Sequence, residues 1–114
     1  MNEPPAIPEV SPAHTANLAK TGAVYLLDVR EQQEWNTGHA PHAHHLPLGD
    51  LDPDAVPRDL PVVAACRSGN RANMAAQALA AAGHEVRIMT GGMEAWAAAG
   101  LPMQSADSSP GLTT

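Results

Sequence analysis

The sequence predicts an α/β fold built on a small, mostly parallel sheet. Three short apolar runs, at 23–28, 61–65 and 85–89, are each followed by a turn and then by a helix-compatible segment. Short β-branched runs that alternate with helices in this way are typical of a parallel sheet. The length of 114 residues suits one domain, and a domain of this size buries roughly two-thirds of its unfolded surface.

The predicted helices have recognisable ends. The first is expected to begin with Ser11 as its N-cap and Pro12 at its first position, and to stop at Gly22. The helix after the second strand is the clearest, because it is rich in Ala and Leu and Gly83 is well placed to terminate it. The last helix is expected to end in the same way at Gly100.

The segment between the first two long strands is expected to be irregular. Glu31 is expected to start a short helix directly after the first strand. The stretch 36–60 is rich in turn formers, which predicts a loop with one short strand near 44–46.

Composition and the chain ends set further limits. The predicted organisation is an N-terminal tail at 1–7, a domain at 8–102 and a flexible C-terminal tail at 103–114. A net charge of −6 without a Lys/Arg stripe argues against nucleic acid or an anionic membrane as partner. No apolar run approaches the roughly 18 residues of a membrane span, and no secretion signal is seen. The single cysteine excludes an internal disulfide, so a cytoplasmic location is expected.

The chemistry is expected at the carboxyl ends of the strands. Asp28, Cys66 and the turn at 90–92 each follow directly after a predicted strand. Ligands of open α/β sheets bind beyond these ends, and parallel strands would open all three turns on one edge.

The segment that begins with the only cysteine, "CRSGNR", has the features of an anion-binding loop. Ser68 and Gly69 let the backbone curl, so that successive N–H groups can point inward. The following helix adds its positive end, and Arg67 and Arg71 add full charges. All three effects favour the thiolate form of Cys66. The alternatives are a buried structural thiol and arginines that serve only as surface charges.

Four segments taken together resemble single-domain rhodaneses, which are thiosulfate or persulfide sulfurtransferases. The segments are "LLDVRE" at 26–31, "EWNTGHAPHAHHLPL" at 34–48, "CRSGNR" at 66–71 and "TGGMEAW" at 90–96. They occur in the order and spacing of that family, and the resemblance runs from about Pro8 to Pro102. It implies a rhodanese-like fold, with helices on both faces of the sheet.

The resemblance also implies roles for particular residues. Cys66 would take up a sulfane sulfur as a persulfide, held by the loop amides and the helix N-terminus. Asp28 and Arg30 would brace the active-site edge. The implied substrate-binding residues are Arg67, Ser68, Gly69, Asn70 and Arg71.

The implied activity needs no cofactor. Thiosulfate or a persulfide would donate the sulfur, and a thiol or cyanide would accept it; a cysteine desulfurase or a thioredoxin-like protein is the implied kind of protein partner. Gly91, Gly92 and Trp96 match the closing turn and last helix of the family, where they have a packing role. The sequence departs from the family at His42, which is usually glycine, and at Ala65, which is usually larger.

Two other functions stay open from the sequence. Cysteine-dependent phosphatases and arsenate reductases use a similar cradle, but their pattern is Cys-x5-Arg, whereas here Arg71 follows Cys66 after four residues. The shorter loop forms a smaller ring of backbone amides, which suits one sulfur atom better than a phosphoryl group with three oxygens. The second alternative is a persulfide carrier or regulatory module that acts with a protein partner and has no turnover of its own.

A histidine cluster raises the question of a metal site. Imidazoles that are close in sequence can bind zinc, nickel or copper. No thiolate or clear carboxylate partner lies nearby, so the simpler interpretation is turn and surface histidines without a metal. The cluster consists of His39, His42, His44 and His45.

Overall fold

A computed structural model describes residues 6–105 and shows a five-stranded sheet in which every strand pair is parallel. The strand order is β1-β5-β4-β2-β3. The strands are β1 (Glu9–Val10), β2 (Tyr25–Asp28), β3 (His44–His45), β4 (Val62–Ala65) and β5 (Val86–Met89). The predicted α/β class is therefore confirmed, and the three long strands lie within one or two residues of their predicted positions.

The helices begin and end largely where the sequence indicates. They are α1 (Pro12–Lys20), α2 (Gln32–Thr37), α3 (Asn70–Ala81) and α4 (Gly92–Ala98), with 3₁₀ turns at Leu48–Asp50 and Pro53–Ala55. The Ser11 hydroxyl accepts a hydrogen bond from the His14 amide, which confirms the predicted N-cap of α1. Gly22, Gly83 and Gly100 follow their helices with φ of 77°, 95° and 72°. This left-handed backbone suits glycine, so these residues end the helices as predicted.

Two features differ from the sequence prediction. Strand β1 was not predicted, because its two residues carry no readable alternation and follow Pro8 in a proline-rich segment. The predicted tails lie mostly outside the described residues, but Gln104 exchanges two backbone hydrogen bonds with His39, at 2.7 and 2.8 Å. The described end of the chain is therefore attached to the loop after α2.

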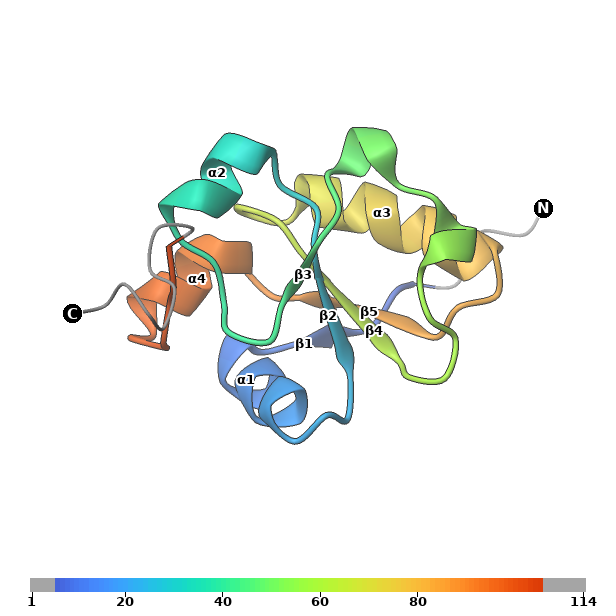
Figure 1. Ribbon diagram of the computed structural model, residues 1–114. Helices are drawn as coiled ribbons and strands as arrows, with labels where there is room; N and C mark the ends of the chain where they lie inside the picture. The colour runs from blue at the N-terminus through green and yellow to red at the C-terminus, as the bar shows by residue number, and fades with distance from the viewer. Residues whose placement is uncertain (1–5, 106–114) are drawn as a thin grey trace.

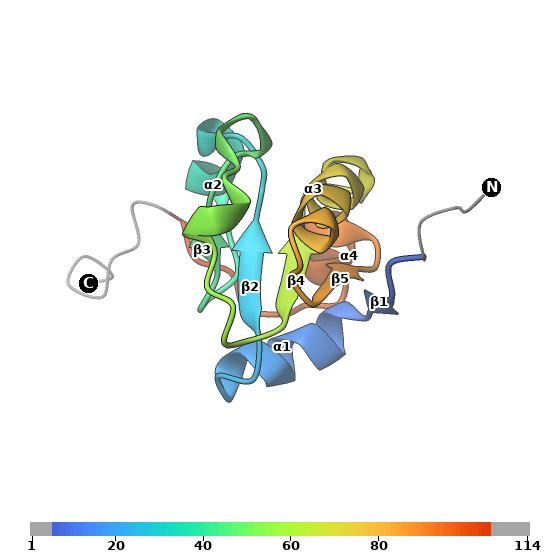
Figure 2. The ribbon, with the colours of Figure 1, turned by 90° about the vertical axis from the view of Figure 1, so that its right-hand side faces the viewer.

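Helices cover both faces of the sheet, as the resemblance implied. Figures 1 and 2 show α1 and α3 on opposite sides of it. Leu26, Val63 and Trp96 share one core cluster with α1 and α4, whereas Leu27 and Cys66 belong to the cluster that packs on α3. This alternation follows from the period of two along a strand. Among residues 6–105, no helix has the length and apolar character needed to cross a membrane.

Candidate active site

The sulfur of Cys66 lies at the carboxyl end of β4 and accepts two backbone hydrogen bonds. The Gly69 amide donates to Sγ at 3.0 Å, and the Ala72 amide, in the first turn of α3, donates at 3.2 Å. Gly69 has a φ of 135°, which side-chain-bearing residues rarely adopt, and this allows the tight curl. Two backbone N–H groups therefore point at the sulfur, one from the loop and one from α3. N–H donors and a helix N-terminus are both groups that favour a bound anion.

The same cysteine is also buried. Only 1% of Cys66 is exposed, and the residue is part of the apolar cluster under α3. The sequence left two interpretations of this cysteine open, a buried structural thiol and a sulfur in an anion-binding loop. The structure combines them, because the side chain is buried and two neighbouring amides donate to its sulfur. In this conformation the sulfur is therefore covered.

Arg71, the last residue of the loop, pairs with a carboxylate from α2. Its guanidinium donates to both oxygens of Glu34, at 2.6 and 2.9 Å. Glu34 also accepts a hydrogen bond from the Glu31 amide, which completes a capping box at the start of α2. Hydrogen bonding from Arg71 lowers the pKa of Glu34 to about 2. The same pair raises the pKa of Arg71, with a smaller contribution from the charge of Cys66.

Arg67 pairs with a carboxylate as well. Its Nε donates to Glu94 on α4 at 3.0 Å, and both side chains are more than half exposed. Both loop arginines thus have a carboxylate partner, so the positive charge predicted around the loop is largely offset. The other two loop side chains, Ser68 and Asn70, are exposed.

The loop backbone is held by the N-terminus of α4. The Met93 amide donates to the Cys66 carbonyl at 2.7 Å, and the Glu94 amide donates to the Arg67 carbonyl at 3.0 Å. Gly92 makes this approach possible: a Cβ on it would lie 2.5 Å from both carbonyl oxygens. The resemblance implied a closing turn and a packing role for Gly92, and the close approach of α4 to the loop depends on its lack of a side chain.

Asp28 and Arg30 form a buried ion pair at the same edge of the sheet. The Arg30 guanidinium donates to both Asp28 oxygens, with Nε–Oδ1 at 3.0 Å and Nη2–Oδ2 at 2.8 Å. It also donates to the Gly38 carbonyl at 2.7 Å, which fixes the turn after α2. The two side chains are 2% and 7% exposed. This geometry fits the bracing role that the resemblance implied.

These elements enclose a groove of about 390 Å³ beside the loop. The residues that line it come from the segment after β2, from α2 and the turn after it, from the cysteine loop, from α4 and from the described C-terminal end. They include Arg30, Glu34, Gly38, Arg67, Glu94 and Met103.

Sequence reasoning missed Glu34 and Glu94 as partners of the loop. They lie 37 and 27 residues from the arginines they bind, so no local spacing could pair them. The available signal was the acidic balance of the chain, 12 Asp and Glu against six Lys and Arg, which makes a carboxylate partner for each arginine the default expectation.

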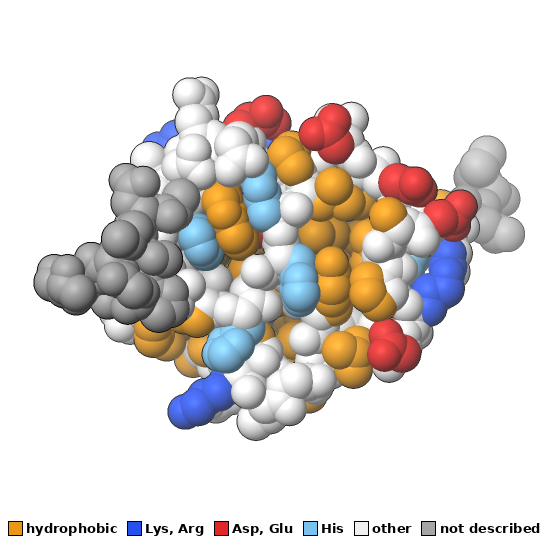
Figure 3. Space-filling model, in the orientation of Figure 1, with side chains coloured by type: hydrophobic (Ala, Val, Ile, Leu, Met, Phe, Trp, Pro, Cys, Tyr) orange, Lys and Arg blue, Asp and Glu red, His pale blue; other side chains and the backbone are white. Residues whose placement is uncertain are grey.

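The histidine cluster is organised by stacking. Trp35 stacks on the rings of His39 and His45, at 3.6 and 4.7 Å between centroids, and His44 stacks on Tyr25 at 4.1 Å. Figure 3 shows histidine side chains beside hydrophobic ones on this face. Among residues 6–105, no three His, Cys, Asp or Glu side chains are grouped so that they could hold a metal ion.

The chain is thus a parallel α/β domain with a cysteine at the carboxyl end of its central strand. Backbone amides of the following loop and helix donate to the sulfur, which places the chain in the class of α/β proteins with a cysteine in an anion-binding loop. Within that class, the sequence matches the Rhodanese-like domain family over residues 11–99, and the chain belongs to this family.

Similar proteins agree with this assignment. The thiosulfate sulfurtransferase GlpE of Actinobacillus succinogenes is 33% identical over 105 residues, which cover 89% of this chain and 94% of that protein. The uncharacterized protein slr1261 of Synechocystis sp. is 38% identical over 104 residues; the match covers 89% of this chain but only 58% of the Synechocystis protein. The crystal structure of a rhodanese-related protein from Thermoplasma volcanium superposes with a TM-score of 0.79 at 26% identity, covering 85% of this chain and 97% of that one.

Proposed function

We propose that this chain is a sulfurtransferase that moves sulfane sulfur from thiosulfate or a persulfide donor to a thiol or cyanide. The reaction passes through a persulfide on Cys66. The observation that carries the proposal is the pair of amide hydrogen bonds from Gly69 and Ala72 to the sulfur. The likeness to GlpE, a thiosulfate sulfurtransferase, supports the same reaction.

The proposed reaction has two displacement steps. The Cys66 thiolate attacks the outer sulfur of thiosulfate, the S–S bond of the donor breaks, and sulfite leaves with the electron pair. The acceptor, a thiolate or cyanide, then attacks the outer sulfur of the Cys66 persulfide and restores the thiolate. Because the outgoing groups are stable anions, no general acid is required. Covalent catalysis of this kind gives ping-pong kinetics.

In this proposal the domain at 8–102 acts in the cytoplasm. A cysteine desulfurase could load Cys66, and a thioredoxin-like protein could unload it. In the same proposal Ser68, Gly69 and Asn70 position the loop amides, and Arg67 and Arg71 orient the anionic donor while each also pairs with a glutamate.

A persulfide carrier is the second candidate, and two observations favour it. Cys66 is 1% exposed and both loop arginines are paired, which slows attack on a small dianion without preventing transfer from a protein that opens the loop. Phosphatase chemistry is disfavoured, because it needs an arginine free to bind phosphate oxygens, and both terminal nitrogens of Arg71 donate to the Glu34 carboxylate.

The test is intact-mass spectrometry after brief exposure to thiosulfate, with steady-state thiosulfate:cyanide turnover measured in parallel. The wild type should gain one sulfur atom that cyanide removes, and Cys66→Ser should gain none and show no turnover. Sulfur transfer by the Cys66→Ser variant would rule out the persulfide mechanism. Mass gain from a loaded cysteine desulfurase, without thiosulfate turnover, would identify the carrier. Hydrolysis of an aryl phosphate without any sulfur uptake would identify a phosphatase.

A further inference from the structure

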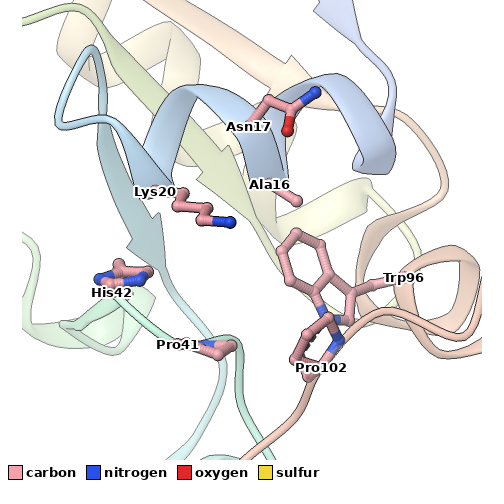
Figure 4. Close-up of a pocket in the computed structure, with 7 residues that line it drawn as sticks. All are labelled: Ala16, Asn17, Lys20, Pro41, His42, Trp96 and Pro102. Carbon is pink, nitrogen blue, oxygen red and sulfur yellow. Dashed lines mark hydrogen bonds between the residues drawn. The ribbon is translucent and has the colours of Figure 1, made fainter.

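A second cavity, of about 360 Å³, lies on the face of the sheet that α1 and α4 cover. It is separate from the groove beside the cysteine loop, and the two share no lining residue. Figure 4 shows the residues around it, which come from α1, from the turn before β3, from α4 and from the segment after α4. They are Ala16, Asn17, Lys20, Pro41, His42, Trp96 and Pro102.

Lys20 stands out among the charged residues of the chain. It is the single lysine, and the other five basic side chains are arginines. Each arginine forms an ion pair with an aspartate or glutamate, whereas Lys20 forms none with any residue in the described range. Its side chain extends from α1 toward the space bounded by His42 and Trp96 (Figure 4). Among the lysine and arginine side chains of residues 6–105, the one without a carboxylate partner therefore borders a cavity.

His42 is held in an unusual backbone conformation at the opposite side of this space. Its φ is 68°, and within residues 6–105 it is the one residue other than glycine with a positive φ. A side chain in this region costs roughly 1 kcal/mol or more, and such residues often mark ligand sites. The imidazole offers a hydrogen-bond donor in both of its protonation states.

The wall of the cavity is apolar and rigid. Trp96 is 1% exposed, and its indole N–H donates to the Pro102 carbonyl at 2.8 Å, the dashed line in Figure 4. Pro41 adds a second proline ring. No aspartate or glutamate lines the cavity, although the chain has 12 of them and a net charge of −6. A small cavity that combines an apolar wall with a few convergent polar groups fits a small-molecule site.

We propose that this cavity binds a small organic carboxylate with a flat apolar body. The carboxylate accepts hydrogen bonds from the Lys20 ammonium and the His42 imidazole. The flat body packs on the wall formed by Ala16 and the two prolines, behind which the buried Trp96 lies. The site is independent of sulfur transfer, since it uses none of the residues of the cysteine loop.

The single lysine gives a direct test. The probe is 2-naphthoate, and its neutral counterpart is 2-naphthamide. The wild-type protein is treated with an amine acylating reagent in the presence of each compound, and peptide mapping follows acylation of Lys20 and of the α-amine, which serves as the internal control. We expect 2-naphthoate to slow acylation of Lys20 in a saturable way and to leave the α-amine unaffected, while 2-naphthamide protects at least about fivefold more weakly.

Variants then assign the contacts, with binding of 2-naphthoate followed by NMR at the Trp96 indole. Lys20→Gln should weaken binding about fivefold and Lys20→Arg should retain it. His42→Gly should also weaken binding while keeping or raising the melting temperature, because glycine relieves the strained backbone. Arg58→Gln, which removes the same charge beside the other face of the sheet, should bind like the wild type. Equal protection by the acid and the amide, or unchanged binding in Lys20→Gln and His42→Gly, would overturn the proposal.

Discussion

The Arg71 guanidinium and the Glu34 carboxylate form a two-pronged ion pair, at 2.6 and 2.9 Å, that joins the cysteine loop to α2 across 37 positions of the chain. Both side chains are less than one-third exposed. The carboxylate of Glu34 therefore offsets the positive charge that Arg71 brings to the cysteine loop. The pair also joins two elements that the sheet does not connect directly.

The first prediction concerns stability against pH. The pKa of Glu34 falls from its ordinary 4.5 to about 2 in the folded protein, chiefly through the hydrogen bond from Arg71. A group whose folded pKa is depressed contributes fully above its unfolded pKa and loses that contribution as the pH falls through its folded pKa. Glu34→Gln should therefore be less stable than the wild type by about 1–2 kcal/mol at pH 7. The difference should shrink as the pH falls from about 4.5 toward 2.

The measurement is urea unfolding of both proteins between pH 7 and pH 3. Glu94→Gln is the matched control, because it breaks the exposed pair with Arg67 and should change the free energy of unfolding by less than about 1 kcal/mol at every pH. A Glu34→Gln deficit that stayed constant across the whole range would contradict the assigned role of the carboxylate.

The second prediction concerns the choice of sulfur donor. Arg71→Ala leaves the Glu34 carboxylate unpaired beside the loop, so repulsion should raise the KM for thiosulfate, a dianion, more than the KM for a persulfide donor, whose reacting end carries a single negative charge. The double variant Glu34→Gln/Arg71→Ala should recover part of the thiosulfate KM, since it removes the repelling charge. Steady-state kinetics with both donors separate the two parameters. Equal losses with both donors, unrelieved in the double variant, would show that the arginine is purely structural.

Local patterns in the sequence predicted most of the framework. Ser11 and Gly83 mark helix ends through capping chemistry that acts within a few residues, so their roles could be read directly. The loop amides around Cys66 were predictable for the same reason, because Gly69 and the start of α3 follow the cysteine within a few positions.

Contacts between distant segments were not predictable. Glu34 and Glu94 approach the loop only because α2 and α4 both lie at the carboxyl end of the sheet, and no spacing in the chain encodes that meeting. Strand β1 was not predicted, because two residues are too few to show the alternation of a strand. The burial of Cys66 was also undecidable, since a cysteine suits an apolar cluster and an anion cradle equally well.

The third prediction tests the buried pair of Asp28 and Arg30. Asp28→Asn leaves the Arg30 charge buried without a counterion, which typically costs about 3–5 kcal/mol. A large fall in melting temperature, or loss of folding at 25 °C, is therefore expected in circular dichroism. Asp54→Asn is the control, because it breaks the exposed pair with Arg58 and should change stability by less than about 1 kcal/mol. Similar melting temperatures for the two variants would mean that the buried pair contributes no more to stability than the exposed pair does.

The fourth prediction isolates the contact between Gly92 and the cysteine loop. Gly92 and Gly100 both have a positive φ, 62° and 72°, so an alanine at either position carries a backbone cost of about 1–2 kcal/mol. They differ in their surroundings: a Cβ at Gly100 meets nothing within 4 Å, whereas one at Gly92 lies 2.5 Å from the Cys66 and Arg67 carbonyl oxygens. To relieve this overlap, α4 must withdraw from the loop, and the hydrogen bond from Met93 to the Cys66 carbonyl must lengthen.

Gly92→Ala should therefore lower the rate of persulfide formation on Cys66 about 10²-fold, because the loop amides no longer hold the sulfur in place. Gly100→Ala should lose stability through its backbone alone and keep the wild-type rate. Single-turnover mass spectrometry with thiosulfate measures the rate, and thermal unfolding measures the backbone cost common to both variants. If the two alanine variants lost activity to the same degree, the approach of α4 to the loop would have no part in positioning the sulfur, and strain alone would account for both.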